Sequence, residues 1–333
     1  MPNKKFRYLK YPVLISIIFS IQLFASENPA FRNRELVSTF SIVACDTNSG
    51  EIGVAVASRF FAVGSVVPWA KANVGAVATQ SFANTTFGWR GLDLLEKGAN
   101  PEEVLTILLR DDNEAEQRQV GIVSFDGQAA TFTGKNCLAW AGGRSGPTYA
   151  VQGNILAGES VVAAMEETFL TTRGTLADRL YAALVAGDKQ GGDARGKQSA
   201  ALIVVKENAG YGGFTDRAID IRVDDHAHPF EELGRLLNFA QMNYSWNQGW
   251  TLFTQKKYEL ALPYMENTAR IAPDNAEVFY DLAVIRLAAG KKDSAIEALS
   301  RAIELNPKLK SQAAGDQDLS ALHQDDRYIQ LTK

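Results

Sequence analysis

Histidine and cysteine are scarce in this sequence of 333 residues, which contains three histidines and two cysteines. Zinc sites take three or four protein ligands, mostly Cys and His, and no cluster with such spacing is present. The chain also lacks a phosphate loop, a dinucleotide fingerprint, an H-E-x-x-H helix and a G-x-S-x-G elbow. We therefore expect no metal and no cofactor, and the sequence does not indicate the enzyme classes that those motifs define.

An excess of charge of one sign is missing as well. Lys and Arg number 34, Asp and Glu number 38, and the formal net charge is -4, without a basic stripe in the expected mature region. Nucleic-acid-binding domains usually carry a basic patch, so we expect no nucleic-acid partner. The apolar fraction of 46% is ordinary for a globular protein, and the length indicates two domains.

Long apolar runs are absent beyond the N-terminal region. There, four basic residues up to Lys10 precede the mainly apolar residues 13–24, and the small residues Ala25 and Ser26 follow. This order is typical of a secretory signal peptide at residues 1–25. A membrane-spanning helix needs about 20 apolar residues, so an uncleaved anchor is the alternative. We expect export to the periplasm or the cell exterior, with a leader at residues 26–38.

The two cysteines, Cys45 and Cys137, lie far apart in the sequence. Export to an oxidising compartment permits a disulfide between them. Pairing depends on a geometry that the sequence does not show. Two buried thiols that act as small apolar side chains are equally consistent with the sequence, so the redox state of the pair stays open.

Residues 39–242 alternate between strand and helix patterns. Residues 39–44 and 52–57 flank a turn and predict a hairpin, and a second hairpin (residues 120–125 and 129–133) surrounds Asp126-Gly127. The order of the elements predicts an α+β domain in which two stacked sheets carry helices on their outer faces. The further predicted strands are residues 74–80, 200–205 and 219–223, and the predicted helices are residues 89–97, 101–110, 159–170, 176–185 and 229–242.

The C-terminal residues 243–333 show no strand pattern and repeat with a period of 34 residues. The matched pairs are Gly249 and Ala283, Ala261 and Ala295, Met265 and Leu299, and Pro273 and Pro307. Small residues at helix crossings and a proline after the second helix are typical of tetratricopeptide repeats. We therefore predict two such helix pairs with a terminal capping helix, and helical hairpins without this repeat geometry are the alternative.

Several segments between residues 39 and 239 resemble one family of bacterial and archaeal proteins. They are TFSIVA at 39–44, GVAVASRFFAVGSVVP at 53–68, GAVATQ at 75–80, VQGNILAG at 151–158, GGDARGKQSAA at 191–201, YGG at 211–213, DR at 216–217 and VDDH at 223–226. On these motifs the chain is identified as a member of the domain-of-unknown-function family 1028 (DUF1028). The resemblance implies the fold of the N-terminal nucleophile (Ntn) hydrolase superfamily, a four-layer α-β-β-α sandwich, for residues 39–242.

The same resemblance implies a nucleophile. In the superfamily, a Thr, Ser or Cys at the start of the first strand is exposed by processing, and its free α-amine acts as the base. An α-amine has a pKa of about 7.7–8.0, close to the working pH. Family members without a signal peptide begin Met-Thr-Phe-Ser, which makes Thr39 the candidate nucleophile. From its residue type alone, Thr39 is equally consistent with an ordinary β-branched strand residue.

A more distant similarity, to proteasome β-type chains, implies further site residues. It places a Ser-Arg pair on the second strand, an oxyanion-side turn near Gly153-Asn154, and a carboxylate and a hydroxyl around the nucleophile, with a lysine that lowers a pKa. The residues assigned to catalysis are Thr39, Ser58, Arg59, Asn154 and Asp193. The residues assigned to binding are Lys71, Gln152, Arg195 and Ser199. The loop at residues 191–198 is interpreted either as pocket lining or as a surface turn.

Two departures from the superfamily pattern leave the function open. Ala57 stands where the proteasome chains have an aspartate, and a leader precedes Thr39, which gives it an amide in place of an amine. One hypothesis is an exported amide-bond hydrolase acting on a small molecule or a peptide. The alternative is a non-catalytic ligand-binding or assembly protein of the cell envelope. The expected partners are a protein bound by the repeats and further copies of the chain, and His226 and His228 are interpreted as turn residues before a helix.

Overall fold

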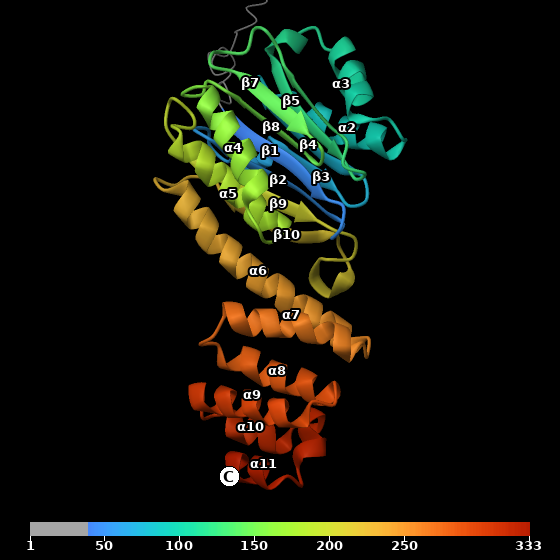
Figure 1. Cartoon of the computed structure of the whole chain (residues 1–333), viewed down its shortest axis with the longest axis vertical. Coiled ribbons are helices and arrows are strands. Elements are labelled where there is room, and N and C mark those ends of the chain that lie inside the picture. The colour runs from blue at the N-terminus through green and yellow to red at the C-terminus, as the bar shows by residue number, and fades with distance from the viewer. Residues whose placement is uncertain (1–38) are drawn as a thin grey trace, which may run out of the picture. The chain divides into compact units, whose positions relative to one another are not determined.

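The computed structural model describes residues 39–333, so the predicted signal peptide and leader lie outside the described part of the chain. Two sheets form the N-terminal domain (Figure 1). The six-stranded sheet has the order β10-β9-β2-β1-β8-β7, and the four-stranded sheet has the order β3-β4-β5-β6. All neighbouring strands in both sheets are antiparallel.

The six-stranded sheet is built around the predicted first hairpin. Its strands are β1 (Thr39–Asp46), β2 (Glu51–Ser58), β7 (Gly142–Gly146), β8 (Tyr149–Asn154), β9 (Ser199–Val205) and β10 (Arg217–Val223). The four-stranded sheet contains β3 (Pro68–Lys71), β4 (Gly75–Ser81), β5 (Arg118–Ser124) and β6 (Ala129–Thr133). The sequence did not predict β3, β7 and β8. In β7 the sequence GGRSG carries no apolar alternation, which removes the signal on which a strand prediction depends.

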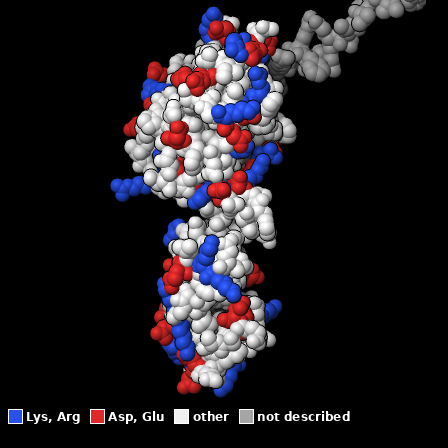
Figure 2. All heavy atoms as spheres, turned by 90° about the vertical axis from the view of Figure 1, so that its right-hand side faces the viewer, with Lys and Arg blue, Asp and Glu red and all other residues white. Residues whose placement is uncertain are grey.

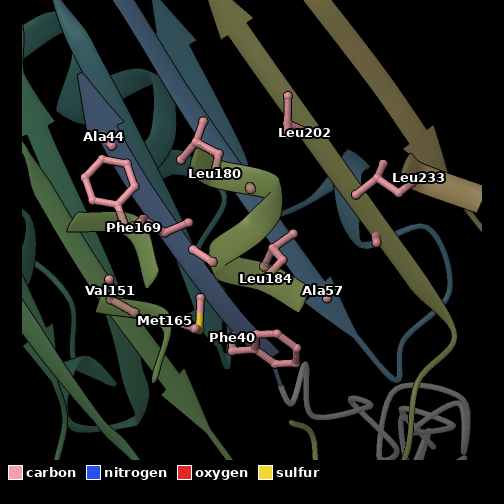
Figure 3. Packing of buried hydrophobic residues seen from close by; sticks show 14 of the residues in the cluster. Phe40, Ala44, Ala57, Val151, Met165, Phe169, Leu180, Leu184, Leu202 and Leu233 are labelled. Carbon is pink, nitrogen blue, oxygen red and sulfur yellow. The ribbon is translucent and has the colours of Figure 1, made fainter. Parts of the chain in front are cut away.

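Apolar side chains form one layer between the sheets and one on each outer face. The layer between the sheets includes Val43, Val54 and Ala78. Helices α4 (Glu159–Thr171) and α5 (Leu176–Lys189) pack on the six-stranded sheet, as Figure 3 shows for Met165, Phe169, Leu180 and Leu184. Helices α2 (Thr86–Glu96) and α3 (Pro101–Arg110) pack on the four-stranded sheet. Alternation along the strands explains this division, since successive residues face opposite sides of a sheet.

Helix α6 (Pro229–Thr254) runs across the predicted domain boundary at residue 242. Its N-terminal residues, including Phe230 and Leu233, pack in the core on the outer face of the six-stranded sheet. Its C-terminal residues, including Trp246 and Trp250, pack in the core of the helical segment. No proline interrupts this helix after its first turn, and Gly249 lies where the chain passes Ala261 and Met265 closely. One helix thus belongs to both domains.

The helical segment continues with antiparallel neighbours, as the 34-residue period predicts (Figure 1). It contains α7 (Tyr258–Ile271), α8 (Ala276–Ala288), α9 (Lys292–Leu305), α10 (Leu309–Gly315) and α11 (Asp326–Thr332). Ala261, Met265, Ala295 and Leu299, which the period matches in pairs, are all fully or almost fully buried. Helix α6 therefore supplies the first helix of the first repeat.

Two tryptophans of α6 bind one carboxylate of α8. The Nε1 atoms of Trp246 and Trp250 both donate to Oδ2 of Asp281, each at 2.7 Å. Burial raises the pKa of Asp281, and the two indole hydrogen bonds oppose that rise. The carboxylate therefore stabilises the first repeat by accepting hydrogen bonds from two partly buried donors.

We expect Asp281→Leu to lower the free energy of unfolding by about 1–3 kcal/mol, because two partly buried N–H donors lose their acceptor. Asp281→Asn should cost less, since an amide oxygen remains. The raised pKa means that the contribution of the wild-type Asp281 to stability is full below its unfolded pKa and falls as the pH rises through its folded pKa. Urea unfolding followed by tryptophan fluorescence at acidic and neutral pH measures both effects. If the difference in free energy of unfolding between wild type and Asp281→Asn does not change with pH, the predicted pH dependence is wrong.

Both cysteines are free thiols in the structure. Cys45 is buried and Cys137 is partly buried. Burial raises the pKa of the Cys45 thiol to about 11. Of the two interpretations that the sequence left open, the structure therefore shows the unpaired thiols.

Residues 39–333 contain neither a membrane-spanning helix nor a cluster of metal-ligating side chains. No helix in this range is long and apolar enough to cross a bilayer. Within the same range, no group of three or more His, Cys, Asp or Glu side chains is placed to hold a metal ion.

Candidate active site

Strand register brings four of the predicted polar residues into one row at an end of the six-stranded sheet. Thr39, the first residue of β1, lies opposite Ser58 of β2 on one side and Asn154 of β8 on the other. Ser58 in turn lies opposite Ser199 of β9. All four side chains are buried. Residues 39, 58, 154 and 199 are far apart in the chain, and the register alone makes them neighbours.

The hydroxyl groups of this row are held by short-range contacts. Thr39 Oγ1 donates to Ser58 Oγ at 3.3 Å. Ser199 Oγ donates to the carbonyl oxygen of Phe60 at 2.5 Å and accepts from the N–H of Val63 at 3.2 Å. Ser199 therefore anchors the chain that leaves β2, while Ser58 faces Thr39. A nucleophilic hydroxyl beside a second hydroxyl is a geometry suited to proton transfer and to orientation.

Asp193 fastens the loop at residues 191–198 to the end of β2. Its carboxylate accepts from the N–H of Arg59 at 2.8 Å, from the N–H of Arg195 at 2.9 Å and from the Arg195 guanidinium at 3.1 Å. The Arg59 guanidinium donates to the Arg195 carbonyl at 2.7 Å. The Asp193 side chain is only 2% exposed, whereas that of Arg195 is 36% exposed. The loop thus lies beside Ser58 and presents cationic groups at the rim of the row.

Below Thr39, neutral amide side chains form a continuous hydrogen-bonded network between the two sheets. Ser41 Oγ donates to Gln80 Oε1 and accepts from Gln152 Nε2, both at 2.6 Å. Gln80 Nε2 donates to the Thr39 carbonyl at 3.2 Å and to Gln119 Oε1 at 2.8 Å. Asn154 Nδ2 also donates to Gln119 Oε1, at 3.0 Å. Since buried polar groups need partners, this network holds β1, β4, β5 and β8 in one relative position.

Three members of the network, Ser41, Gln80 and Gln119, were not among the predicted site residues. A signal for them was present, because each is a polar residue at a buried position of an otherwise apolar strand. Gly121 of β5 belongs to the same arrangement. A Cβ at this position would clash with the Gln152 amide, so only glycine leaves room for the network.

Lys71 is the one predicted residue that the structure places elsewhere. Its ammonium pairs with Glu96 of α2 at 2.6 Å, and its side chain is 47% exposed. Lys71 lies opposite Gly75, at the start of β4, whereas Gln80 near the end of β4 contacts Thr39. The prediction relied on closeness in sequence to the third strand. The β3–β4 hairpin places the lysine at the opposite end of that strand.

The structure also shows where Ala57 lies, the residue that stands in place of the aspartate of the proteasome chains. Ala57 lies opposite Phe40, and both side chains belong to the core under α4 and α5 (Figure 3). Thr39 precedes Phe40 and Ser58 follows Ala57. The side chains of Thr39 and Ser58 therefore face the other side of the sheet. An acid at position 57 would thus lie in the helix-facing core. The lack of an acid at position 57 therefore removes no charge from the surroundings of the Thr39 hydroxyl.

His226 and His228 lie on an exposed turn before α6, as the sequence predicted. Nδ1 of His226 accepts from the N–H of His228 at 3.0 Å, so the pair contacts itself. The backbone N–H of His226 donates to the carbonyl of Gln198. These histidines therefore lie next to the loop at residues 191–198 without joining the buried row.

Sequence comparison places residues 39–233 in the family described as "Family of unknown function (DUF1028)". The chain belongs to this family. Residues 252–315 match a tetratricopeptide repeat family, which confirms the predicted repeats. Among solved structures, protein SPO2555 from Silicibacter pomeroyi, described as a DUF1028 structure, is similar at 31% identity with a TM-score of 0.56. The match covers 61% of this chain and 89% of that one. No curated protein matches the chain.

The DUF1028 match begins at Thr39, the first residue of β1 and of the buried row. It ends within α6 at residue 233, before the repeats begin. The candidate site therefore lies wholly inside the family domain.

Proposed function

We propose that this DUF1028 protein is an exported amide-bond hydrolase whose nucleophile is the Thr39 hydroxyl. The observation that carries the proposal is the buried row in which Thr39 Oγ1 donates to Ser58 Oγ at the very start of β1. Two packed sheets with helices on both outer faces are also the arrangement that the Ntn hydrolase superfamily requires. The fold thus supports the resemblance on which Thr39 was chosen.

The proposed reaction begins with a cut between Ser38 and Thr39. The freed α-amine takes the proton of Thr39 Oγ1, and the oxygen attacks the carbonyl carbon of the substrate. The resulting tetrahedral oxyanion collapses, the C–N bond breaks, and the leaving amine takes the proton. Water then attacks the ester on Thr39 Oγ1, the acid leaves, and the hydroxyl is restored. Gln80 holds the Thr39 carbonyl, and Ser58 orients the hydroxyl, so both act by positioning.

The neutral network explains why the α-amine is the proposed base. Ser41, Gln80, Gln119 and Gln152 are uncharged and cannot take a proton near neutral pH. Asp193 is the acidic residue of the predicted set, and its oxygens accept hydrogen bonds from Arg59 and Arg195. Lys71 pairs with Glu96 instead. A terminal amine has a pKa suited to the task and would arise at the reacting residue itself.

Intact-mass measurement of protein purified from the exporting cell tests the proposal. We expect the mature chain to begin at Thr39, because the mechanism needs a free amine on that residue. Edman sequencing of the same sample gives an independent readout. Protein that begins near Ser26 and still hydrolyses an amide substrate would contradict the free-amine mechanism.

The alternative proposal is a ligand-binding or assembly protein, and the repeats are the feature that favours it. Tetratricopeptide repeats commonly bind protein segments, and a groove of about 430 Å³ between α7, α8 and α9 is lined by Phe279, Leu282 and Arg286. Basic and acidic side chains are interspersed over the face in Figure 2, so no single-sign patch on that face selects a nucleic acid. A Thr39→Ala strain with an unchanged phenotype would favour this alternative.

A further inference from the structure

A second cavity lies away from Thr39, between the sheet domain and the first repeat. Its volume is about 550 Å³, within the range of roughly 300–1,000 Å³ that small-molecule sites occupy. The start of β2, the end of β9 and the N-terminus of α5 supply Glu51, Lys206 and Asp178. Helices α6 and α7 supply Tyr244 and Arg270 on the other side. The cavity therefore needs both domains.

The charges in this cavity are not matched in pairs. Asp178 is used by the structure, since its carboxylate accepts from Thr175 at the start of α5 and from Gln241 Nε2 at 2.7 Å. Within residues 39–333, neither the Lys206 ammonium nor the Arg270 guanidinium has a carboxylate within 4 Å. Burial raises the pKa of Glu51, which favours its uncharged form, and Lys206 opposes that shift. Two cations without an ion-pair partner therefore share the cavity with the carboxyls of Glu51 and Asp178, of which Asp178 is already engaged by Thr175 and Gln241.

Two tyrosines, Tyr244 and Tyr264, line the same cavity. The rings of Tyr244 and Tyr264 meet edge to face, with centroids 6.4 Å apart and an interplanar angle of 88°. Burial is the main cause that raises the pKa of the Tyr244 hydroxyl. Pro263 and Ile271 add apolar surface on α7. Sites of this composition bind the apolar body of a ligand by burial and orient it with a few polar groups.

We propose that this cavity binds a small carboxylate with an apolar body, held between the Lys206 ammonium and the Arg270 guanidinium. The carboxylate supplies the anionic partner that both cations lack, and its body lies against Tyr244 and Tyr264. Charge-assisted hydrogen bonds to a carboxylate are stronger than neutral ones, so the anion dominates recognition. The site does not depend on the chemistry at Thr39. Because its walls come from both domains, an occupied cavity stabilises their junction.

Titration calorimetry with matched probes tests this proposal on the full mature chain. Benzoate, benzamide and benzylamine share one ring and differ in charge. We expect benzoate to bind at least roughly tenfold more tightly than the neutral and cationic probes, since it alone pairs with both cations. Benzamide binding as tightly as benzoate, or no heat from benzoate at millimolar concentration, would overturn the proposal.

Variants locate the binding in the cavity. Lys206→Met and Arg270→Gln should each weaken benzoate binding on the order of tenfold. At a pH where Glu51 is ionised, Glu51→Gln should strengthen it, because the variant then removes a negative charge beside the anion, and damaged folding cannot produce a gain. Lys308→Met changes an exposed lysine just before α10; it is the matched control and should leave the affinity unchanged. Benzoate affinity that is the same in Lys206→Met and Glu51→Gln as in wild type would place the ligand elsewhere and refute the assignment.

Discussion

A β-lactone probe should acylate the processed wild-type chain once, and the Thr39→Ala variant should give no adduct. The nucleophilic oxygen opens the strained lactone and forms an ester, which adds the mass of the probe. Loss of the nucleophile in hydroxyl-dependent hydrolases lowers the rate by several powers of ten, and we expect at least about a thousandfold here. Intact-mass spectrometry over time measures the rate of labelling.

Two controls make this experiment specific for Thr39. Ser65→Ala removes an exposed hydroxyl that only bonds the nearby Ala62 carbonyl, and labelling should proceed as in wild type. Wild-type protein that retains the leader should label as slowly as Thr39→Ala, because the base is then an amide. Equal labelling of Thr39→Ala and wild type would remove Thr39 as the nucleophile. Rapid labelling of the chain with its leader would instead remove the α-amine as the base.

Asp193→Ala should be the most destabilising single change at the rim of the site. The Asp193 carboxylate is almost fully buried and binds two backbone N–H groups and one guanidinium. Its removal leaves the backbone N–H groups of Arg59 and Arg195 without this acceptor, and we expect a loss of about 3 kcal/mol in the free energy of unfolding. The loop at residues 191–198 should then detach from β2 and admit proteases.

Urea unfolding and limited proteolysis of the folded protein measure the effects of Asp193→Ala. Asp188→Ala is the matched control, because Asp188 pairs with Lys197 near the same loop but is more exposed. Surface ion pairs contribute about 0–1 kcal/mol, so the control should differ little from wild type. If the two variants lose equal stability, Asp193 does not hold the loop in the way that the hydrogen bonds indicate.

Local patterns in the sequence were sufficient for much of the fold. Residues 39–44 and 52–57 predicted the β1–β2 hairpin, and the Asp126-Gly127 turn predicted β5 and β6. The 34-residue period predicted the repeats that the family comparison confirms. These features depend on neighbours within a few residues or on periodic burial, which a single sequence displays.

Other elements depended on contacts that no local pattern records. Strand β7 is rich in glycine and is a strand because β8 pairs with it. Helix α6 was expected to end near residue 242, but its second half is buried by the repeats and the helix continues to Thr254. Tertiary packing supplied the stability in both cases.

Some residues of the candidate site could likewise be found from the sequence, and others only from the structure. The resemblance to the family implied Thr39, and the more distant similarity to proteasome β-type chains implied Ser58, Asn154, Asp193 and Ser199, before any geometry was known. Lys71 was wrongly placed near them, because a lysine on β3 can lie at either end of the sheet until the hairpin register is set. Gln80 and Gln119 were missed, because a buried amide gains its role only from the partner strand that meets it.

Residues that lie close together in the chain thus determined the order of helices and strands and the repeat period. They also carry the family motifs. Tertiary structure alone decided which strand ends meet at Thr39, which side of the sheet Ala57 occupies, and that Lys206 and Arg270 share one cavity. The physical reason is the two-residue period of a strand together with its register. A shift of one residue moves every side chain to the other face, and only the packed sheets choose between the two.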